Sequence, residues 1–233
     1  MDYVLHYAPD NASLIVRMAL DKLGLPYRCA LVDRATRAQQ SEAYLRLNPN
    51  GLIPVLETPQ GPLFETGAIL LWLADTHGGL GPAPDHPERG NFLKWLFFLS
   101  NTLHPSLRML FYPDQYAGPD PALRAAFDRL TRTRLREILA RLDAAAATGP
   151  DWLGGPEPSA LDLYLAACLR WCALYPVTAD RSWFRLADTP RLHAICTRLE
   201  SQPFVAAAQA AEGLGATPFT NPSHPNPPEG SAT

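Results

Sequence analysis

The chain has little lysine and no long apolar run, and each shortage argues against a class of function. Lys22 and Lys94 are its only lysines, and 20 basic against 23 acidic residues leave a net charge of −3. No basic surface for nucleic acid or an anionic membrane is therefore expected. No apolar segment approaches the length of a membrane span, and the apolar segment at residues 93–99 is interrupted by Lys94.

Cysteine is also scarce. The four cysteines form no Cys-x-x-Cys pair and no zinc pattern, so we expect no metal. Cys168 and Cys172 lie four residues apart on an expected helix. A disulfide or a metal pair would fit this spacing, but we favour the interpretation that both are buried thiols of the core. The first seven residues lack a basic start followed by a long apolar run, so we expect no secretory signal and a cytoplasmic location.

The first third of the chain alternates strand and helix patterns. Strands are expected at residues 4–7 and 27–32, joined by a helix over 13–23, and this β-α-β arrangement predicts parallel pairing. A short helix over 41–47, a hairpin of strands 54–58 and 62–64, and a helix from 65–66 through Leu73 complete the unit.

The remainder predicts helices only. A Gly- and Pro-rich stretch, 78–87, is typical of a linker, and helices are expected at 88–111, 121–147, 159–174, 190–201 and 203–211. Ser159 and Asp162 have the spacing of a capping box. We therefore divide the chain into an α/β domain (1–77), a linker (78–87), an all-helical domain (88–215) and an extended or disordered tail (216–233).

Three sequence features suggest a site for an extended thiol peptide. Pro54 follows a Gly turn at a strand start, which suits a cis Ile53–Pro54 bond that would expose the Ile53 N–H and C=O to a peptide; a trans proline at a strand edge is the alternative. Glu65 and Thr66 precede an apolar helix, where Thr66 as N-cap could bind a carboxylate and Glu65 an ammonium; a capped helix with an exposed acid is the alternative.

The third feature is the turn before the first helix. Ser13 is expected to be the N-cap there, either in a structural role alone or with its hydroxyl stabilising a thiolate. A thiol with a pKa near 8.5 is only about 3% ionised at pH 7. One hydrogen bond to charged sulfur, worth roughly 1.5–3 kcal/mol, together with the helix terminus is sufficient to ionise it.

These features, in this order, resemble a cytosolic glutathione S-transferase of bacterial type over about residues 3–215. The segment 48–56 is similar to the family's Asn-Pro-x-Gly-x-Val/Ile-Pro-x-Leu motif, and 65–69 to its Glu-Ser/Thr-x-Ala-Ile motif. Residues 152–155 and 159–163 are similar to its Leu-x-Gly and Ser/Thr-x-x-Asp elements. The resemblance implies a thioredoxin-like N-terminal domain, an all-helical C-terminal domain, a homodimer, and glutathione held by Ile53, Pro54, Glu65, Thr66, Asn50 and Gln40.

The chain departs from this family pattern at the turn. Beta-class relatives carry a cysteine where this chain has Ala12, so the turn cannot form a mixed disulfide with glutathione. Ser13 is the first candidate for the thiolate partner, Asn11 the second and Tyr7 the third, with backbone amides alone as a further alternative. Gln39 and Gln40 stand where relatives often have Lys or His near the glycine carboxylate of glutathione, which Arg34 or Arg37 could bind instead.

The resemblance also implies a second-substrate site between the domains. His104 corresponds to a site histidine of beta-class members, and Arg108, Tyr112 and Trp171 are further candidates, although each could serve packing alone. The leading hypothesis is conjugation of glutathione thiolate to a small apolar electrophile. The alternatives are glutathione-dependent reduction of disulfides or peroxides, and a non-catalytic binding or assembly module.

Overall fold

A four-stranded sheet forms the centre of the first domain. In this computed structural model, which describes residues 3–231, the strands are β1 (Tyr3–Tyr7), β2 (Tyr27–Leu31), β3 (Val55–Thr58) and β4 (Gly61–Phe64). Their order is β2-β1-β3-β4, with β1 and β2 parallel and β3 antiparallel to both β1 and β4. The β-α-β and hairpin arrangement expected from the sequence is confirmed.

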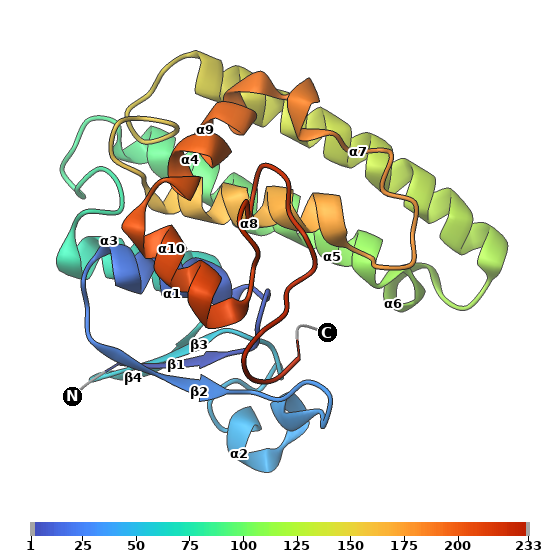
Figure 1. Cartoon of the computed structure of the whole chain (residues 1–233), viewed down its shortest axis with the longest axis horizontal. Helices are drawn as coiled ribbons and strands as arrows, with labels where there is room; N and C mark the ends of the chain where they lie inside the picture. The colour runs from blue at the N-terminus through green and yellow to red at the C-terminus, as the bar shows by residue number, and fades with distance from the viewer. Residues whose placement is uncertain (1–2, 232–233) are drawn as a thin grey trace.

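Helices cover both faces of this sheet. Figure 1 shows α1 (Ser13–Lys22) and α3 (Thr66–His77) on the face toward the helical domain and α2 (Glu42–Leu45) on the opposite side. Leu5 and Leu56 point into the main core with α1 and α3, whereas Val55 packs with Val32 and Tyr44 in a smaller core under α2. Successive side chains of β3 point to opposite faces of the sheet, so this one strand contributes to both cores.

The second domain is all-helical, and the predicted fold class is confirmed. Its helices are α4 (Arg89–Phe98), α5 (His104–Phe111), α6 (Pro113–Ala117), α7 (Pro121–Ala147), α8 (Ala160–Leu174), α9 (Pro190–Glu200) and α10 (Pro203–Glu212), with a short 3₁₀ turn at Leu186–Asp188. Helix α8 runs through the centre of this domain (Figure 1), and all but one of its residues are buried. Within residues 3–231, no helix combines the length and the apolar character needed to cross a bilayer.

Several local expectations were wrong. The single helix expected over 88–111 is divided by a π-helical turn at Leu99–Leu103, directly before Pro105, which has no N–H to continue an α-helical ladder. Helix α6, which begins at Pro113, was not expected. Ser13 and Thr66 are not N-caps but the first residues of α1 and α3, preceded by Ala12 and Glu65.

The predicted capping box of α8 is confirmed. The Ser159 hydroxyl accepts the Leu161 N–H at 3.0 Å, and the Asp162 carboxylate accepts the Ser159 N–H at 2.8 Å and the Gly154 N–H at 2.7 Å. Cys168 and Cys172 are buried free thiols, as favoured from the sequence.

The described part of the tail beyond α10 packs against both domains. Residues 217–231 form no helix or strand, yet Phe219 is only 2% exposed and belongs to the main core. Glu200 on α9 accepts the backbone N–H groups of Phe219 and Thr220, each at 2.8 Å. Figure 1 shows the tail passing beside α8 and returning toward β2 of the first domain, where the Tyr7 hydroxyl donates to Glu229.

Candidate functional site

A cavity of about 660 Å³ lies between the two domains. This volume is within the usual range for small-molecule sites, about 300–1,000 Å³. The first domain lines it mainly with residues of loops, turns and the start of α3: Asp10, Asn11, Ala12, Arg34, Gln39, Gln40, Ile53, Pro54, Glu65 and Thr66. The helical domain contributes mainly aromatic and basic side chains: His104, Arg108, Phe111, Tyr112, Tyr164, Trp171 and Tyr175.

The segment before β3 borders the cavity with backbone outside the sheet. The Ile53–Pro54 peptide bond is cis, as expected from the sequence. The register of β1 with β3 reaches only as far as the pair His6–Val55, so Ile53 lies beyond the paired part of the strand. Both Ile53 and Pro54 line the cavity, in a position where an extended ligand could continue the sheet.

Glu65 and Thr66 lie side by side on the cavity at the start of α3. Glu65 has a φ of 69°, in the left-handed region that non-glycine residues adopt at a cost of order 1–3 kcal/mol. Thr66 is buried, and the first amides of α3 have no acceptor within the helix. This corner therefore combines an exposed carboxylate with a helix terminus that favours an anion.

Of the three predicted thiolate partners, the structure places only Asn11 on the cavity. Ser13 is fully buried; its hydroxyl donates to the Ala8 carbonyl at 3.0 Å and accepts the Ala8 N–H at 3.3 Å. Tyr7 is buried and donates to Glu229, and its burial, followed by this contact, raises the pKa of the phenol well above its ordinary value. Neither side chain is directed at the space a ligand would occupy.

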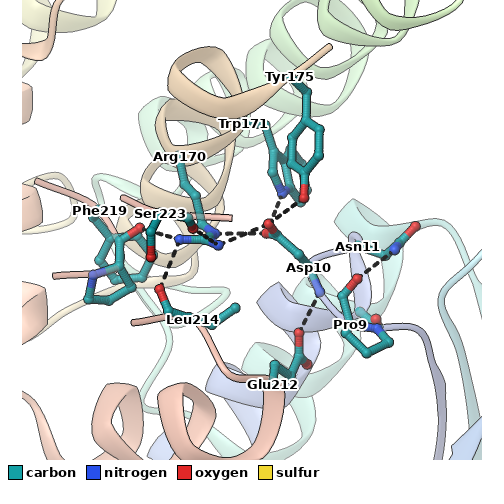
Figure 2. A network of polar contacts seen from close by, with 12 residues as sticks. Pro9, Asp10, Asn11, Arg170, Trp171, Tyr175, Glu212, Leu214, Phe219 and Ser223 are labelled. Carbon is teal, nitrogen blue, oxygen red and sulfur yellow. Dashed lines mark hydrogen bonds and ion pairs between the residues drawn. The ribbon is translucent and has the colours of Figure 1, made fainter. Parts of the chain in front are cut away.

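Asn11 is held in place from two sides. Its Nδ2 donates to the Pro9 carbonyl at 2.8 Å (Figure 2), and its Oδ1 accepts from Arg34 Nη1 at 3.2 Å. Arg34 Nη2 in turn donates to the Tyr112 hydroxyl at 3.1 Å, so a polar chain joins the turn to the helical domain. Arg34 lines the cavity, whereas its alternative Arg37 does not.

Of the two remaining residues predicted to bind glutathione, Gln40 and Asn50, one lines the cavity and the other does not. Gln40 lines the cavity, and its amide lies against Gly51, where a Cβ would come within 2.5 Å of Nε2. Gly51 also has a φ of 61°, so both space and backbone favour glycine there. Asn50 is exposed outside the cavity, and its N–H donates to the Asn48 side chain at 3.0 Å.

All four residues predicted for the second-substrate side line the cavity. The His104 ring packs against Trp171 with centroids 5.3 Å apart, and its Nδ1 is 2.8 Å from the Tyr164 hydroxyl. The guanidinium of Arg108 lies 5.1 Å from the centre of the Tyr112 ring. Together these side chains form an aromatic wall with one basic group at its edge.

His104 is expected to stay neutral throughout the neutral pH range. Burial, and then the charge of Arg108, lowers its pKa to about 4. A folded-state pKa below the unfolded value, about 6.5, contributes stability above pH 6.5 that is lost as the pH falls toward 4. NMR titration of the ring should therefore show no protonation between pH 6 and 8. The unfolding free energy of His104→Gln should fall less steeply than that of wild type below pH 6.5; equal slopes would contradict the assignment.

Sequence reasoning missed several residues of the cavity, among them Asp10, Phe111, Tyr164 and Tyr175. The aromatic residues follow the core-facing pattern of their helices and carry no separate functional signal. Asp10, unlike these aromatic residues, lies in the turn that was predicted to be functional, directly before Asn11. Its carboxylate is buried and paired with residues about 160 positions away, which no local pattern reveals.

Comparison with known proteins identifies the class to which this fold and site belong. Residues 12–76 match the family model for the glutathione S-transferase N-terminal domain, and residues 113–198 match that for the C-terminal domain. The chain belongs to the glutathione S-transferase family, as the sequence resemblance implied.

Individual members of this family match the chain over most of its length and most of their own. The chain is 34% identical over 212 residues to glutathione S-transferase GST-4.5 of Xanthomonas campestris, covering 90% of this chain and 98% of that protein. It is 29% identical to the disulfide-bond oxidoreductase YfcG of Escherichia coli K12, covering 91% and 96%. A sphingomonad glutathione S-transferase solved with glutathione superposes with a TM-score of 0.73 at 32% identity, covering 91% of this chain and 100% of that one.

Proposed function

We propose that this protein activates glutathione as a thiolate and transfers it to small apolar electrophiles. The observation that carries the proposal is one cavity bordered by Glu65–Thr66, by Ile53 and by Asn11, with the aromatic wall of the helical domain opposite. No redox-active cysteine is needed, because the attacking sulfur belongs to the co-substrate. Positioning and thiolate stabilisation supply the rate.

Each part of glutathione has a counterpart at this cavity. The Glu65 carboxylate pairs with the γ-glutamyl ammonium, and Thr66 with the first amides of α3 binds its carboxylate. The Ile53 backbone pairs with the cysteinyl unit as an added strand. Arg34 and Gln40 face the glycine carboxylate, and the electrophile occupies the aromatic wall.

We propose Asn11 as the thiolate partner, because Ser13 is enclosed by Ala8. Asn11→Ala should raise the pKa of bound glutathione by about one unit, since one donor to charged sulfur is worth at least about 1.5 kcal/mol. Turnover at neutral pH should then fall by up to about tenfold. Ser13→Ala is the matched control: it should lower thermal stability and leave the thiol pKa as it was. A shifted pKa in Ser13→Ala alone would reverse the assignment.

The proposed activity is tested by calorimetric titration with glutathione and by conjugation of an aryl halide. Binding together with conjugation supports the proposal. Faster turnover of a mixed disulfide would favour the second candidate, a reductase in which a second glutathione supplies the resolving sulfur; the oxidoreductase relative from Escherichia coli is the observation favouring it. Absence of glutathione binding would favour a non-catalytic module and would overturn the transferase.

We further propose a cytoplasmic homodimer. Phe97 on α4 is 49% exposed, which offers apolar surface for a second copy of the chain. Light scattering of the purified protein should give twice the mass of 25.6 kDa expected for one chain. A single-chain mass would exclude the dimer.

A further inference from the structure

A buried polar network joins the turn that carries Asn11 to the far end of the chain (Figure 2). The Asp10 carboxylate accepts from Arg170 Nε at 2.8 Å and Nη2 at 3.0 Å, from Trp171 Nε1 at 3.0 Å and from the Tyr175 hydroxyl at 2.7 Å. Asp10 is 5% exposed and Arg170 is fully buried. These are charge-assisted bonds between buried groups, so they fix the orientation of the carboxylate firmly.

The backbone of Asp10 is held as well. Its N–H donates to Glu212 Oε2 at 2.8 Å, and Glu212 Oε1 accepts from Arg17 Nε of α1 at 2.8 Å. Asp10 has a φ of 53°, a left-handed conformation that persists only when its surroundings determine it. Contacts from α8, from the end of α10 and from α1 thus set the conformation of the residue directly before Asn11.

Backbone carbonyls of the tail accept the remaining hydrogen bonds of the Arg170 guanidinium. Nη1 donates to the Pro218 carbonyl at 3.0 Å and to that of Leu214 at 3.4 Å, while Nη2 donates to the Ser223 carbonyl at 2.9 Å. The guanidinium therefore lies between the turn on one side and backbone of the tail on the other (Figure 2). The tail carbonyls and the Asp10 carboxylate thus bind the same guanidinium from two sides.

We propose that Asp10 is a positioning residue for the thiolate site, and that Arg170 and the tail segment 214–223 act through it to set the position of Asn11. The inference rests on the proposed function. Asp10 itself gives no hydrogen bond to the sulfur; a shift of the turn by a fraction of an ångström changes the contact between Asn11 and the thiolate. Displacements of about 1 Å in a reacting group can cost roughly a hundredfold in rate.

Asp10→Asn in the full chain tests this role. The amide is nearly isosteric but loses the charge that holds Arg170, so the turn should relax. The pKa of bound glutathione, followed by ultraviolet absorbance of the thiolate, should rise by about one unit, which lowers the thiolate fraction at neutral pH by up to about tenfold. Affinity for glutathione should change less than about threefold, since Glu65 and Thr66 lie elsewhere. If this variant does not fold, Tyr175→Phe removes one of the four bonds and is measured in the same way.

Phe219→Ala tests the contribution of the tail, because Phe219 anchors the tail in the core without lining the cavity. It should also raise the thiol pKa, by less than Asp10→Asn does. Ser159→Ala is the control for general destabilisation: it weakens α8 at the capping box and should leave the thiol pKa unchanged. Asp10→Glu keeps the charge but should raise the thiol pKa as well, since the longer side chain cannot occupy the same enclosed position.

The outcomes separate this inference from the proposed function. Wild-type protein that binds glutathione with a lowered thiol pKa, together with shifted values in Asp10→Asn and Phe219→Ala, supports both. A lowered pKa that stays the same in folded Asp10→Asn overturns the positioning role alone, and the same result in Phe219→Ala overturns the role of the tail. Wild-type protein that does not bind glutathione overturns the proposed function, and this inference with it.

Discussion

Asp162→Ala should lower the unfolding free energy by about 2–6 kcal/mol. Its carboxylate is the acceptor for two backbone N–H groups, those of Ser159 and Gly154, and Asp162 is only 2% exposed. Alanine would leave both donors without this acceptor, and an unsatisfied buried polar group costs about 1–3 kcal/mol. Asp162 also joins the loop before α8 to the first turn of that helix, around which the second domain packs.

Urea denaturation at pH 8 measures this effect. Burial raises the pKa of Asp162 to about 6, against the opposing effect of the two N–H donors, so at pH 8 the group is ionised and both bonds are at full strength. Ser159→Ala is the comparison: it removes the acceptor of the Leu161 N–H and the donor to the Trp152 carbonyl at 2.7 Å, each worth about 1 kcal/mol. A loss below about 2 kcal/mol for Asp162→Ala would contradict the expected cost of leaving both N–H groups without their acceptor.

The features of the fold that were predictable are those with local causes. The hairpin of β3 and β4 follows from two short strand patterns around residues 59–61, and the capping box follows from Ser159 and Asp162 three residues apart. The parallel pairing of β1 and β2 follows from the helix between them. In each case residues within about 20 positions determine the geometry, so the pattern is present in the sequence itself.

What could not be predicted depends on partners far along the chain. The tail is rich in Pro and Asn and has no apolar periodicity, yet Arg170 and Glu200 bind its backbone. The buried position of Ser13 could not be predicted for a related reason. Its neighbour Ala8 encloses the hydroxyl, and the chain path that does so is set by the paired Asp10 between them.

The second large effect is expected at Glu65, in the proposed glutathione site. Glu65→Ala should weaken glutathione binding by about 2–4 kcal/mol, roughly 30- to 700-fold in Kd. The Glu65 carboxylate is exposed on the cavity of the free protein, and a bound γ-glutamyl group would cover it. Loss of one partner then leaves the ligand ammonium desolvated without a counter-charge, which is the costly case for an ion pair.

Cysteinylglycine provides the discriminating ligand, because it lacks the γ-glutamyl group and keeps the thiol. Wild-type protein and Glu65→Ala should bind this dipeptide with equal affinity while differing in affinity for glutathione. Glu65→Gln is the matched variant: it keeps the side-chain shape and the Cβ at a φ of 69°, so backbone strain is the same in all three proteins. Its affinity for glutathione should lie between those of wild type and Glu65→Ala. Equal losses for both ligands would mean that Glu65 supports the cavity wall and does not pair with the ammonium.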